Sequence, residues 1–496
     1  MDRSSGILLH LSSLPGGHGI GDLGPAAIRF LDYLADCKQS WWQMLPVGPI
    51  GPGNSPYQSP SSFAGNPLFI SLESLRELGL LDHEYRPSSA PSGARVDFGR
   101  VIQSKDKWLR RAFRKFDTTS AAFLRFRASQ AHWLDDYACF QALSHEHAGL
   151  PWTQWPAAER RREPKALAAA QARLRDEIDY QAFLQFQFQH QWERLRRAAR
   201  DRGIRLIGDV PIFVSHDSAE VWARPELFLL NKKGDPRFVA GVPPDYFCEE
   251  GQRWGNPLYD WQAHERERFA WWIDRMKAQC ARFDLIRLDH FRGFESYWRI
   301  PASAPTAITG QWCDGPRDQF LQALAQALGG LPLIAEDLGD ITPEVLALRD
   351  RFNLPGMKVL QFAFGSGPSN AYLPCHHARN AVVYTGTHDN DTTRGWIGSL
   401  QKSSRTSSSE LAFLKRYMGV KTENLAWSLV RAALASVCDL AIIPLQDVLL
   451  LGASARMNVP GKPAGNWGWR VTSALLNQAE PRARLREVTE VFDRIR

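Results

Sequence analysis

Eight short runs of aliphatic and β-branched residues recur along the chain, and stretches with helical spacing lie between them. The runs cover residues 6–12, 41–47, 204–214, 285–291, 333–338, 357–364, 381–388 and 440–446. Their apolar residues are nearly continuous, which is typical of strands that are buried on both faces of a parallel sheet. Strands that alternate with helices eight times predict an α/β fold of the (β/α)8, or TIM barrel, type.

Helical spacing is clearest in the stretches 25–36, 184–200, 269–283, 342–352 and 423–437. In the second of these, Leu184, Phe188, Trp192 and Leu195 recur every three or four residues, and Gly203 follows as a stop signal. These stretches fall between the apolar runs, so we expect them to form helices of the barrel's outer ring.

The chain has 496 residues, whereas a barrel needs about 250. The excess falls in long gaps between the runs, so we expect one catalytic barrel over 1–496 with insertion subdomains between strands. These are a mainly helical insertion at 68–180, a loop-rich one at 215–265 and a short one at 391–423. Stretches 86–95 and 403–409 are rich in Ser or Pro and are predicted to be mobile surface loops.

The composition argues against a protein that binds nucleic acid or spans a membrane. A formal net charge of +7 is mild for this length, and the chain carries no known nucleic-acid motif. No apolar run is long enough to span a membrane, and no signal peptide is apparent. We therefore expect a cytoplasmic protein without nucleic-acid or membrane partners. Seven irregularly spaced cysteines predict reduced thiols and no metal cluster.

Ionisable side chains gather where four of the apolar runs end. Asp209, Asp289, Glu336 and Asp389 occupy these positions. Because the carboxyl ends of barrel strands meet at one rim, where TIM-barrel active sites lie, we expect these carboxylates to lie together. Any one of them could instead cap a helix or form a turn.

Clustered carboxylates suit cleavage of a glycosidic bond, which needs one protonated acid and one ionised group at the anomeric carbon. Like charges separate their pKa values, so one carboxyl can stay protonated near neutral pH. Arg287 should share a strand face with Asp289 and hold it ionised. A metal site involving His216, His290 or His388 is the rival interpretation. No zinc-like spacing supports it, and a structural ion remains open.

Several strings resemble one family. IRLDHFRGF (286–294), IAEDLG (334–339) and VVYTGTHDNDTT (382–393) are similar to the catalytic segments of the amylomaltase, or disproportionating-enzyme, family of 4-α-glucanotransferases. This is family 77 of the α-amylase clan. SGILLHLSSLP (5–15), SPYQSPSSFAGNP (55–67) and RMNVPGKPAGNWGWR (456–470) extend the resemblance along nearly the whole chain.

The resemblance implies a retaining enzyme that moves a segment of an α-1,4-glucan to a new 4-hydroxyl, without a cofactor. The donors would be maltooligosaccharides or glucans derived from starch or glycogen, and glucose could be the acceptor. Asp289 would be the nucleophile, Glu336 the general acid and base, and Asp389 a stabiliser of the transition state. The implied substrate-binding residues are Ser55, Tyr57, Asp209, Arg287, Trp254, Asn256, His290 and His388.

Three positions depart from the family's pattern. Cys248 replaces a usual Ser, Gly365 stands where an acidic residue is expected, and Cys375 occupies a usual His position. These changes concern the glucan groove and the choice of acceptor. Two alternatives remain at this stage: an α-1,4-glucan hydrolase of the same clan, and a non-catalytic glucan-binding protein.

Overall fold

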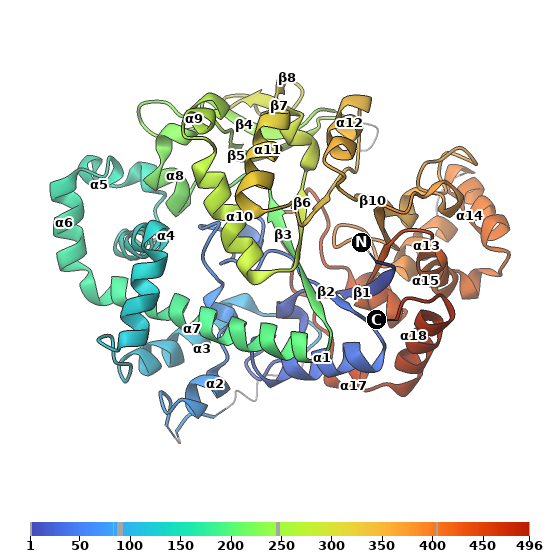
Figure 1. Ribbon diagram of the computed structural model, residues 1–496, viewed down its shortest axis with the longest axis horizontal. Coiled ribbons are helices and arrows are strands. Elements are labelled where there is room, and N and C mark those ends of the chain that lie inside the picture. Colours follow the sequence, from blue (N-terminus) through green and yellow to red (C-terminus); the bar gives the residue numbers. More distant parts are fainter. Residues whose placement is uncertain (1, 83, 87–92, 245–248, 403–404, 496) are drawn as a thin grey trace.

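Eight parallel strands form the centre of the computed structural model, which describes residues 2–82, 84–86, 93–244, 249–402 and 405–495 (Figure 1). They are β1(Ser4–Leu8), β2(Trp41–Gln43), β3(Arg205–Pro211), β6(Leu285–Asp289), β9(Leu333–Ala335), β10(Gly356–Val359), β11(Ala381–Tyr384) and β12(Leu440–Pro444). Their order in the sheet is β10-β11-β12-β1-β2-β3-β6-β9. The N–H of Ala335 in β9 donates to the carbonyl of Pro355, just before β10, at 2.9 Å. The two edges therefore meet, and the predicted (β/α)8 barrel is confirmed.

Every barrel strand is shorter than the apolar run that predicted it. The run at 381–388 holds only four strand residues, and His388 lies in the loop that follows β11. The run at 333–338 ends as a strand at Ala335, so Glu336 also follows its strand. The runs are longer because most of the residues that follow each strand are also buried, although Phe362 in the run at 357–364 is 41% exposed.

Helices cover the outside of the barrel. They include α1(Pro25–Asp36), α7(Arg175–Asp201), α10(Ala270–Arg282), α11(Arg317–Leu328), α12(Pro343–Arg351), α15(Leu425–Ala435) and α18(Ala479–Val491). The short α16(Leu445–Val448) directly follows β12 at its carboxyl end, and the short α17(Ser473–Leu476) precedes α18. All five predicted helices are present, although α7 begins nine residues earlier than predicted. The apolar stripe of α7, with Phe188, Trp192 and Leu195, is buried as the spacing predicts.

The stretch 68–180 holds α2(Leu72–Glu77), α3(Phe98–Phe113), α4(Ala121–Glu146), α5(Ala157–Arg160), α6(Pro164–Arg173) and the start of α7. These helices form a lobe at one side of the barrel, in which α4 packs along α7 (Figure 1). No helix within the described residues is both long and apolar enough to cross a membrane.

A second sheet, which the sequence analysis did not predict, lies beside the barrel. Its strands are β4(Phe238–Val242), β5(Gln252–Pro257), β7(Ser296–Pro301) and β8(Gln311–Asp314), in the antiparallel order β5-β4-β7-β8. Two of these strands fall in the stretch 215–265 that was expected to be loop-rich, together with α8(Ala219–Ala223) and α9(Trp261–Arg266). The strands lack long apolar runs because their side chains are only partly buried.

The stretch 391–423 contains α13(Thr393–Lys402) and α14(Arg405–Met418). The predicted surface loop at 403–409 is therefore wrong from residue 405 onward, while 403–404 lie outside the described residues. The serines there are followed by a helical pattern in which Leu414 is fully buried, and this packing outweighs their weak helix propensity. The other predicted loop, 86–95, lies mostly outside the described residues.

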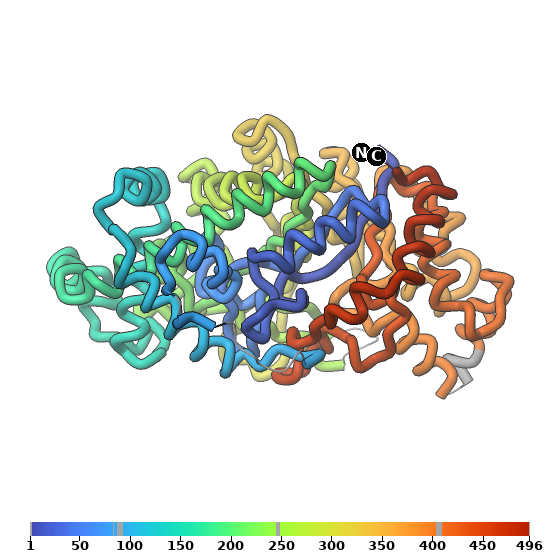
Figure 2. Tube along the Cα trace, turned by 90° about the horizontal axis from the view of Figure 1, so that it is seen from below, coloured from blue at the N-terminus to red at the C-terminus, as the bar shows by residue number. Residues whose placement is uncertain are grey.

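The two ends of the described chain lie side by side (Figure 2). The fully buried Arg494 donates to the carbonyls of Ser4, Leu434, Ser436 and Cys438 at 2.6–3.0 Å. Ser4 is the first residue of β1, so these contacts lie at the amino ends of the strands, opposite the rim that carries the carboxylates.

Candidate active site

Arg287 links two carboxylates at the barrel mouth. It lies in β6 two residues before Asp289, so both side chains leave the same face of the strand. Its Nη1 lies 2.9 Å from both carboxylate oxygens of Asp209, in the neighbouring strand β3, and 2.7 Å from Oδ1 of Asp289. Burial raises the pKa of Asp209 to about 6, with Arg287 opposing and the charge of Asp289 adding to the shift. The guanidinium fixes the orientation of Asp289.

Tyr57 joins this group to the loop after β11. Its hydroxyl donates to Oδ2 of Asp209 at 2.9 Å, and its ring stacks on His388 with centroids 5.1 Å apart. Trp467 packs against both rings, at 5.6 Å from Tyr57 and 5.9 Å from His388. The Oγ of Ser55 accepts from the N–H of Tyr57 at 3.2 Å, so Ser55 supports the tyrosine's backbone.

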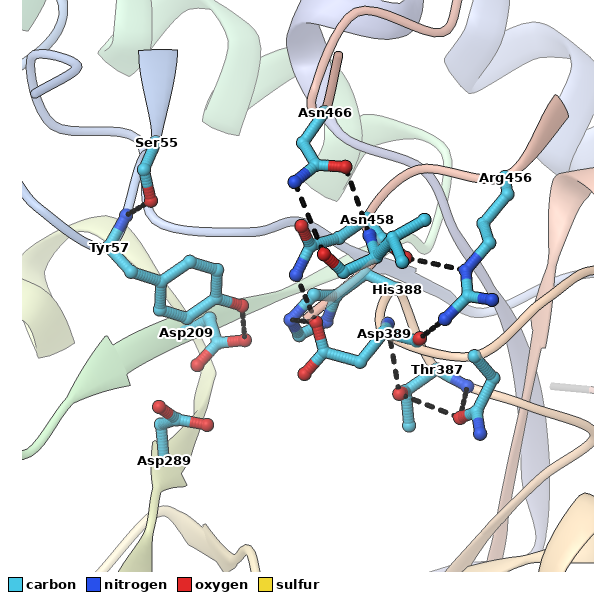
Figure 3. A network of polar contacts seen from close by, with 12 residues as sticks. Ser55, Tyr57, Asp209, Asp289, Thr387, His388, Asp389, Arg456, Asn458 and Asn466 are labelled. Carbon is cyan, nitrogen blue, oxygen red and sulfur yellow. Dashed lines mark hydrogen bonds and ion pairs between the residues drawn. The ribbon is translucent and has the colours of Figure 1, made fainter. Parts of the chain in front are cut away.

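Asp389 is held from several sides (Figure 3). Its Oδ1 accepts from Nδ2 of Asn458 at 2.6 Å and lies 3.4 Å from Nε2 of His388. Arg456 donates to the backbone carbonyl of Asp389 at 2.6 Å, and the Asp389 N–H donates to Oγ1 of Thr387 at 3.3 Å. The Asp389 side chain remains about half exposed, so it is fixed in place while still open to a ligand.

Glu336 follows β9 and faces the β6 end of the rim. Its Oε2 accepts from the backbone N–H of His290 at 2.7 Å, and its Oε1 accepts from the N–H of Leu338 at 3.1 Å. Enclosure by protein raises the pKa of Glu336 to about 8. The charge of Asp289 adds to this effect, and Arg287 and the two N–H donors oppose it. Glu336 is therefore a carboxylic acid that keeps its proton at neutral pH.

His290, in left-handed conformation at φ 55°, turns the chain sharply after β6. Removal from water lowers its pKa to about 4, so the ring is neutral. Trp254 of β5 packs edge-on against this ring with centroids 4.9 Å apart. Asn256 lies in the same strand. Its Nδ2 donates to the carbonyl of Val214 at 2.8 Å, and its Oδ1 accepts from Nε2 of Gln58 at 3.3 Å. The second sheet thereby contributes one wall of the site through Trp254.

A small cavity of about 30 Å³ lies next to His388 at the carboxyl ends of β1, β11 and β12. His10, Thr387, Asp391, Asp447 and Arg456 are among its lining residues. Burial lowers the pKa of His10 to about 3, with a further contribution from His388, so His10 is neutral.

Sequence analysis did not single out Asn458, Arg456, Trp467, Asp447 or His10. Asn458 and Arg456 belong to a quoted string that carried no assigned role. Asp447 had the same signal as the other carboxylates, since it directly follows the eighth apolar run. Of the departures, Cys375 is exposed and Gly365 lies between β10 and β11, as Cys375 does. Cys248 lies outside the described residues.

The acidic groups at the mouth do not form a cluster with metal-ligand spacing among the described residues. The group that has such spacing, with ligand atoms within 4.8 Å, is Glu146, His147 and Glu159 in the helical lobe. Arg173 bridges both of these glutamates, at 2.8 and 3.0 Å. His216, which was considered as a ligand, bonds instead to the carbonyl of Gly234 at 2.8 Å.

A protonated acid beside a carboxylate that an arginine holds in place is the equipment that glycosidic-bond cleavage requires. Fold and site thus define a (β/α)8-barrel enzyme that acts on glycosidic bonds. A family model of glycoside hydrolase family 77, described as 4-alpha-glucanotransferase, matches residues 9–476. The chain belongs to this 4-α-glucanotransferase family and is a transferase.

Similar proteins carry the name of the same activity or family. The 4-alpha-glucanotransferase of Thermus thermophilus is 50% identical over 509 residues, covering 100% of both chains. That of Synechocystis sp. is 50% identical over 485 residues, covering 96% of this chain and 95% of the relative. The structure of amylomaltase from Streptococcus agalactiae in complex with acarbose matches with a TM-score of 0.95 at 34% identity, covering 100% of both chains.

Proposed function

We propose that the chain transfers α-1,4-glucan segments by a retaining double displacement through a covalent glycosyl-aspartate on Asp289. The observation that carries the proposal is the pairing of Glu336, whose pKa is raised to about 8, with Asp289, which Arg287 holds at 2.7 Å. The raised pKa of Glu336 suits an acid that gives a proton to the leaving oxygen, and the fixed orientation of Asp289 suits a nucleophile.

In the first step an Asp289 oxygen bonds to the anomeric carbon as the bond from that carbon to the leaving sugar's O4 breaks. Glu336 gives its proton to that O4. In the second step Glu336 takes the proton from the 4-hydroxyl of an acceptor sugar, whose oxygen bonds to the anomeric carbon as the bond to Asp289 breaks. Glu336 ends protonated and Asp289 ionised, so both are ready for another cycle.

Asp389 and His388 are proposed to bind hydroxyls of the reacting sugar. Both border the same mouth as Asp289, and Asn458 and Tyr57 fix their positions. Such contacts accelerate the reaction only if they strengthen in the transition state, which a rigid carboxylate favours. Asp209 and Arg287 orient Asp289, and Ser55 supports the backbone of Tyr57.

Transfer instead of hydrolysis requires an acceptor sugar held in attack geometry and exclusion of water. Trp254, partly buried against His290, is the proposed wall for this acceptor. The donors are proposed to be maltooligosaccharides and glucans from starch or glycogen, with glucose as an acceptor and the cytoplasm as location. The single unit 1–496 with its insertions at 68–180, 215–265 and 391–423 is likewise a proposal.

The direct test of transfer is the time course of products from purified protein and maltotriose. A ladder of longer maltooligosaccharides together with glucose is expected. Glucose and maltose alone would instead identify a hydrolase, and no product at all would point to glucan binding without catalysis.

The covalent step is tested with 5-fluoro-α-D-glucosyl fluoride, whose intermediate forms faster than it breaks down. Intact-mass and peptide mass spectrometry should locate one added glycosyl group on Asp289. The Asp289→Asn variant should fold and stay unlabelled. A label on another residue, or turnover by Asp289→Asn comparable to the unaltered enzyme, would contradict the assignment.

A further inference from the structure

The loop 386–392 carries His388 and Asp389, and a small cavity lies beside it. The loop leads from β11 to α13, and Thr387, His388, Asn390, Asp391 and Thr392 line this cavity of about 30 Å³. Close packing on all sides normally fixes a side chain's position. Packing is incomplete on the cavity side of the loop, so polar contacts contribute to holding it.

Asp447 supplies such contacts at both ends of the loop. It is buried in α16, directly after β12, and lines the same cavity. Its Oδ2 accepts from Oγ1 of Thr385, the last residue before the loop, at 2.5 Å. It also accepts from Thr393, the first residue after the loop, through the N–H at 2.7 Å and the hydroxyl at 2.7 Å. One carboxylate therefore joins the residues on either side of the loop.

We propose that Asp447 is a positioning residue for catalysis, which sets the placement of Asp389 and His388 by tying Thr385 to Thr393. It reaches no catalytic carboxylate directly by any contact among the described residues, so it acts through the loop. The proposal rests on the proposed role of Asp389 as a group that binds the reacting sugar.

The physical reason is the sensitivity of catalysis to small displacements. Three donors converge on the buried Asp447: the hydroxyls of Thr385 and Thr393 and the N–H of Thr393. Burial raises the pKa of Asp447, and these donors oppose the shift. Without Asp447 they lose a buried partner, and the two ends of the loop are no longer tied to each other. Because a misplacement of about 1 Å can cost about 100-fold in rate, loss of this tie should lower kcat by roughly 10- to 100-fold.

The variants for the test are Asp447→Asn, Thr385→Val and Thr385→Ser. Asp447→Asn and Thr385→Val should lower kcat for maltotriose disproportionation. Thr385→Ser keeps the hydroxyl and should restore most of the rate. Glu220→Gln is the matched control: Glu220 is also buried and accepts from Ser61 and Ser62, at 2.7 and 2.9 Å, but it does not contact the loop.

A second readout separates positioning from general stability. Calorimetric titration with acarbose is compared for the unaltered enzyme, Asp447→Asn, Asp389→Asn and the double variant. We expect Asp447→Asn to weaken binding, and the double variant to bind no more weakly than Asp389→Asn alone, since both changes act on one group. Binding needs no turnover, so inactive variants remain informative.

Additive losses in the double variant, or equal rates for Thr385→Val and Thr385→Ser, would overturn the proposal. If the melting curve shows that Asp447→Asn does not fold, the comparison of kcat between Thr385→Val and Thr385→Ser still tests the proposal. A failure of the proposed function has a different signature, because Asp389→Asn alone would then keep full activity and full acarbose affinity.

Discussion

At Glu336 the surroundings act in opposite directions. Two backbone N–H donors and Arg287 favour the ionised carboxylate, whereas enclosure and the charge of Asp289 favour the protonated acid. Enclosure prevails, and the pKa rises from 4.5 to about 8. Asp289 and Glu336 lie at the ends of adjacent strands, so the charge on one influences proton loss from the other.

This balance predicts a limit to activity at alkaline pH. Since Glu336 must carry its proton to start the reaction, kcat/KM should fall as pH rises through about 8. The profile is measured with maltotriose over a range in which the melting temperature stays constant. A falling limb near the ordinary glutamate pKa of 4.5 would contradict the assignment of Glu336 as the acid.

Glu336→Gln should lose nearly all activity on maltotriose, by roughly 100- to 10,000-fold, the usual range for removal of a general acid. An α-maltosyl fluoride donor should recover much of the first step, because fluoride leaves without a proton. Fluoride release is measured with an ion electrode. If Glu336→Gln lost as much activity on the fluoride donor as on maltotriose, Glu336 would be excluded as the acid. The Asp389→Asn variant is the comparison, because it should lose rate on both donors.

Among single residues, the sequence predicted which carboxylates lie at the rim better than it predicted the hydrogen bonds that hold them. Asp209, Asp289, Glu336 and Asp389 lie at one rim because parallel strands end together. The contacts of Asn458 and Arg456 with the β11 loop could not be predicted, because both residues lie in an irregular segment after β12 that no strand end places. Asp447 could have been found by the rule that found the other carboxylates.

Among the elements, β5 has the clearest functional consequence. It places Trp254 against His290, one residue from Asp289. We predict that Trp254→Ala shifts the reaction toward water, raising the ratio of hydrolysis to transfer severalfold, because the acceptor loses an apolar wall. Released reducing ends and longer glucans are quantified together. Trp312→Ala is the control, since Trp312 is 39% exposed on β8, at the opposite edge of the same sheet; an equal shift there would contradict the prediction.

The eight barrel strands were found because near-continuous apolar runs are a strong signal of burial on both faces. The helices were found from apolar residues spaced every three or four positions, as in 184–200, and from start signals, as at Thr342 and Pro343 in 342–352. The second sheet was missed because its strands are short and partly exposed, so their pattern resembles that of loops. The helix that begins at Arg405 was missed because serine content was weighed above the helical spacing of the residues that follow, including Leu414.

At the scale of the whole molecule, Arg494 holds the last part of the chain against β1 and the segment before β12, at the amino ends of these strands. Arg494→Met should lower the free energy of unfolding by roughly 2–6 kcal/mol. The carbonyls of Ser4 and Cys438 lose this donor, at about 1–3 kcal/mol each, whereas those of Leu434 and Ser436 still accept from Arg3. Thermal melting measures the loss, and kcat at low temperature should not change. Arg486→Met is the control, because Arg486 is 54% exposed and pairs with Glu490 of the same helix. Equal losses in both variants would contradict the role of Arg494.

The meeting of the chain's two ends also determines how the enzyme can be handled. Ser4 and Arg494 contact each other at the amino ends of the strands, while Asp289 ends its strand on the opposite face. A bead, an electrode or a fused protein attached at either end would therefore lie beneath the barrel. Large α-1,4-glucans could still reach the open mouth, and an immobilised preparation should keep its activity on them.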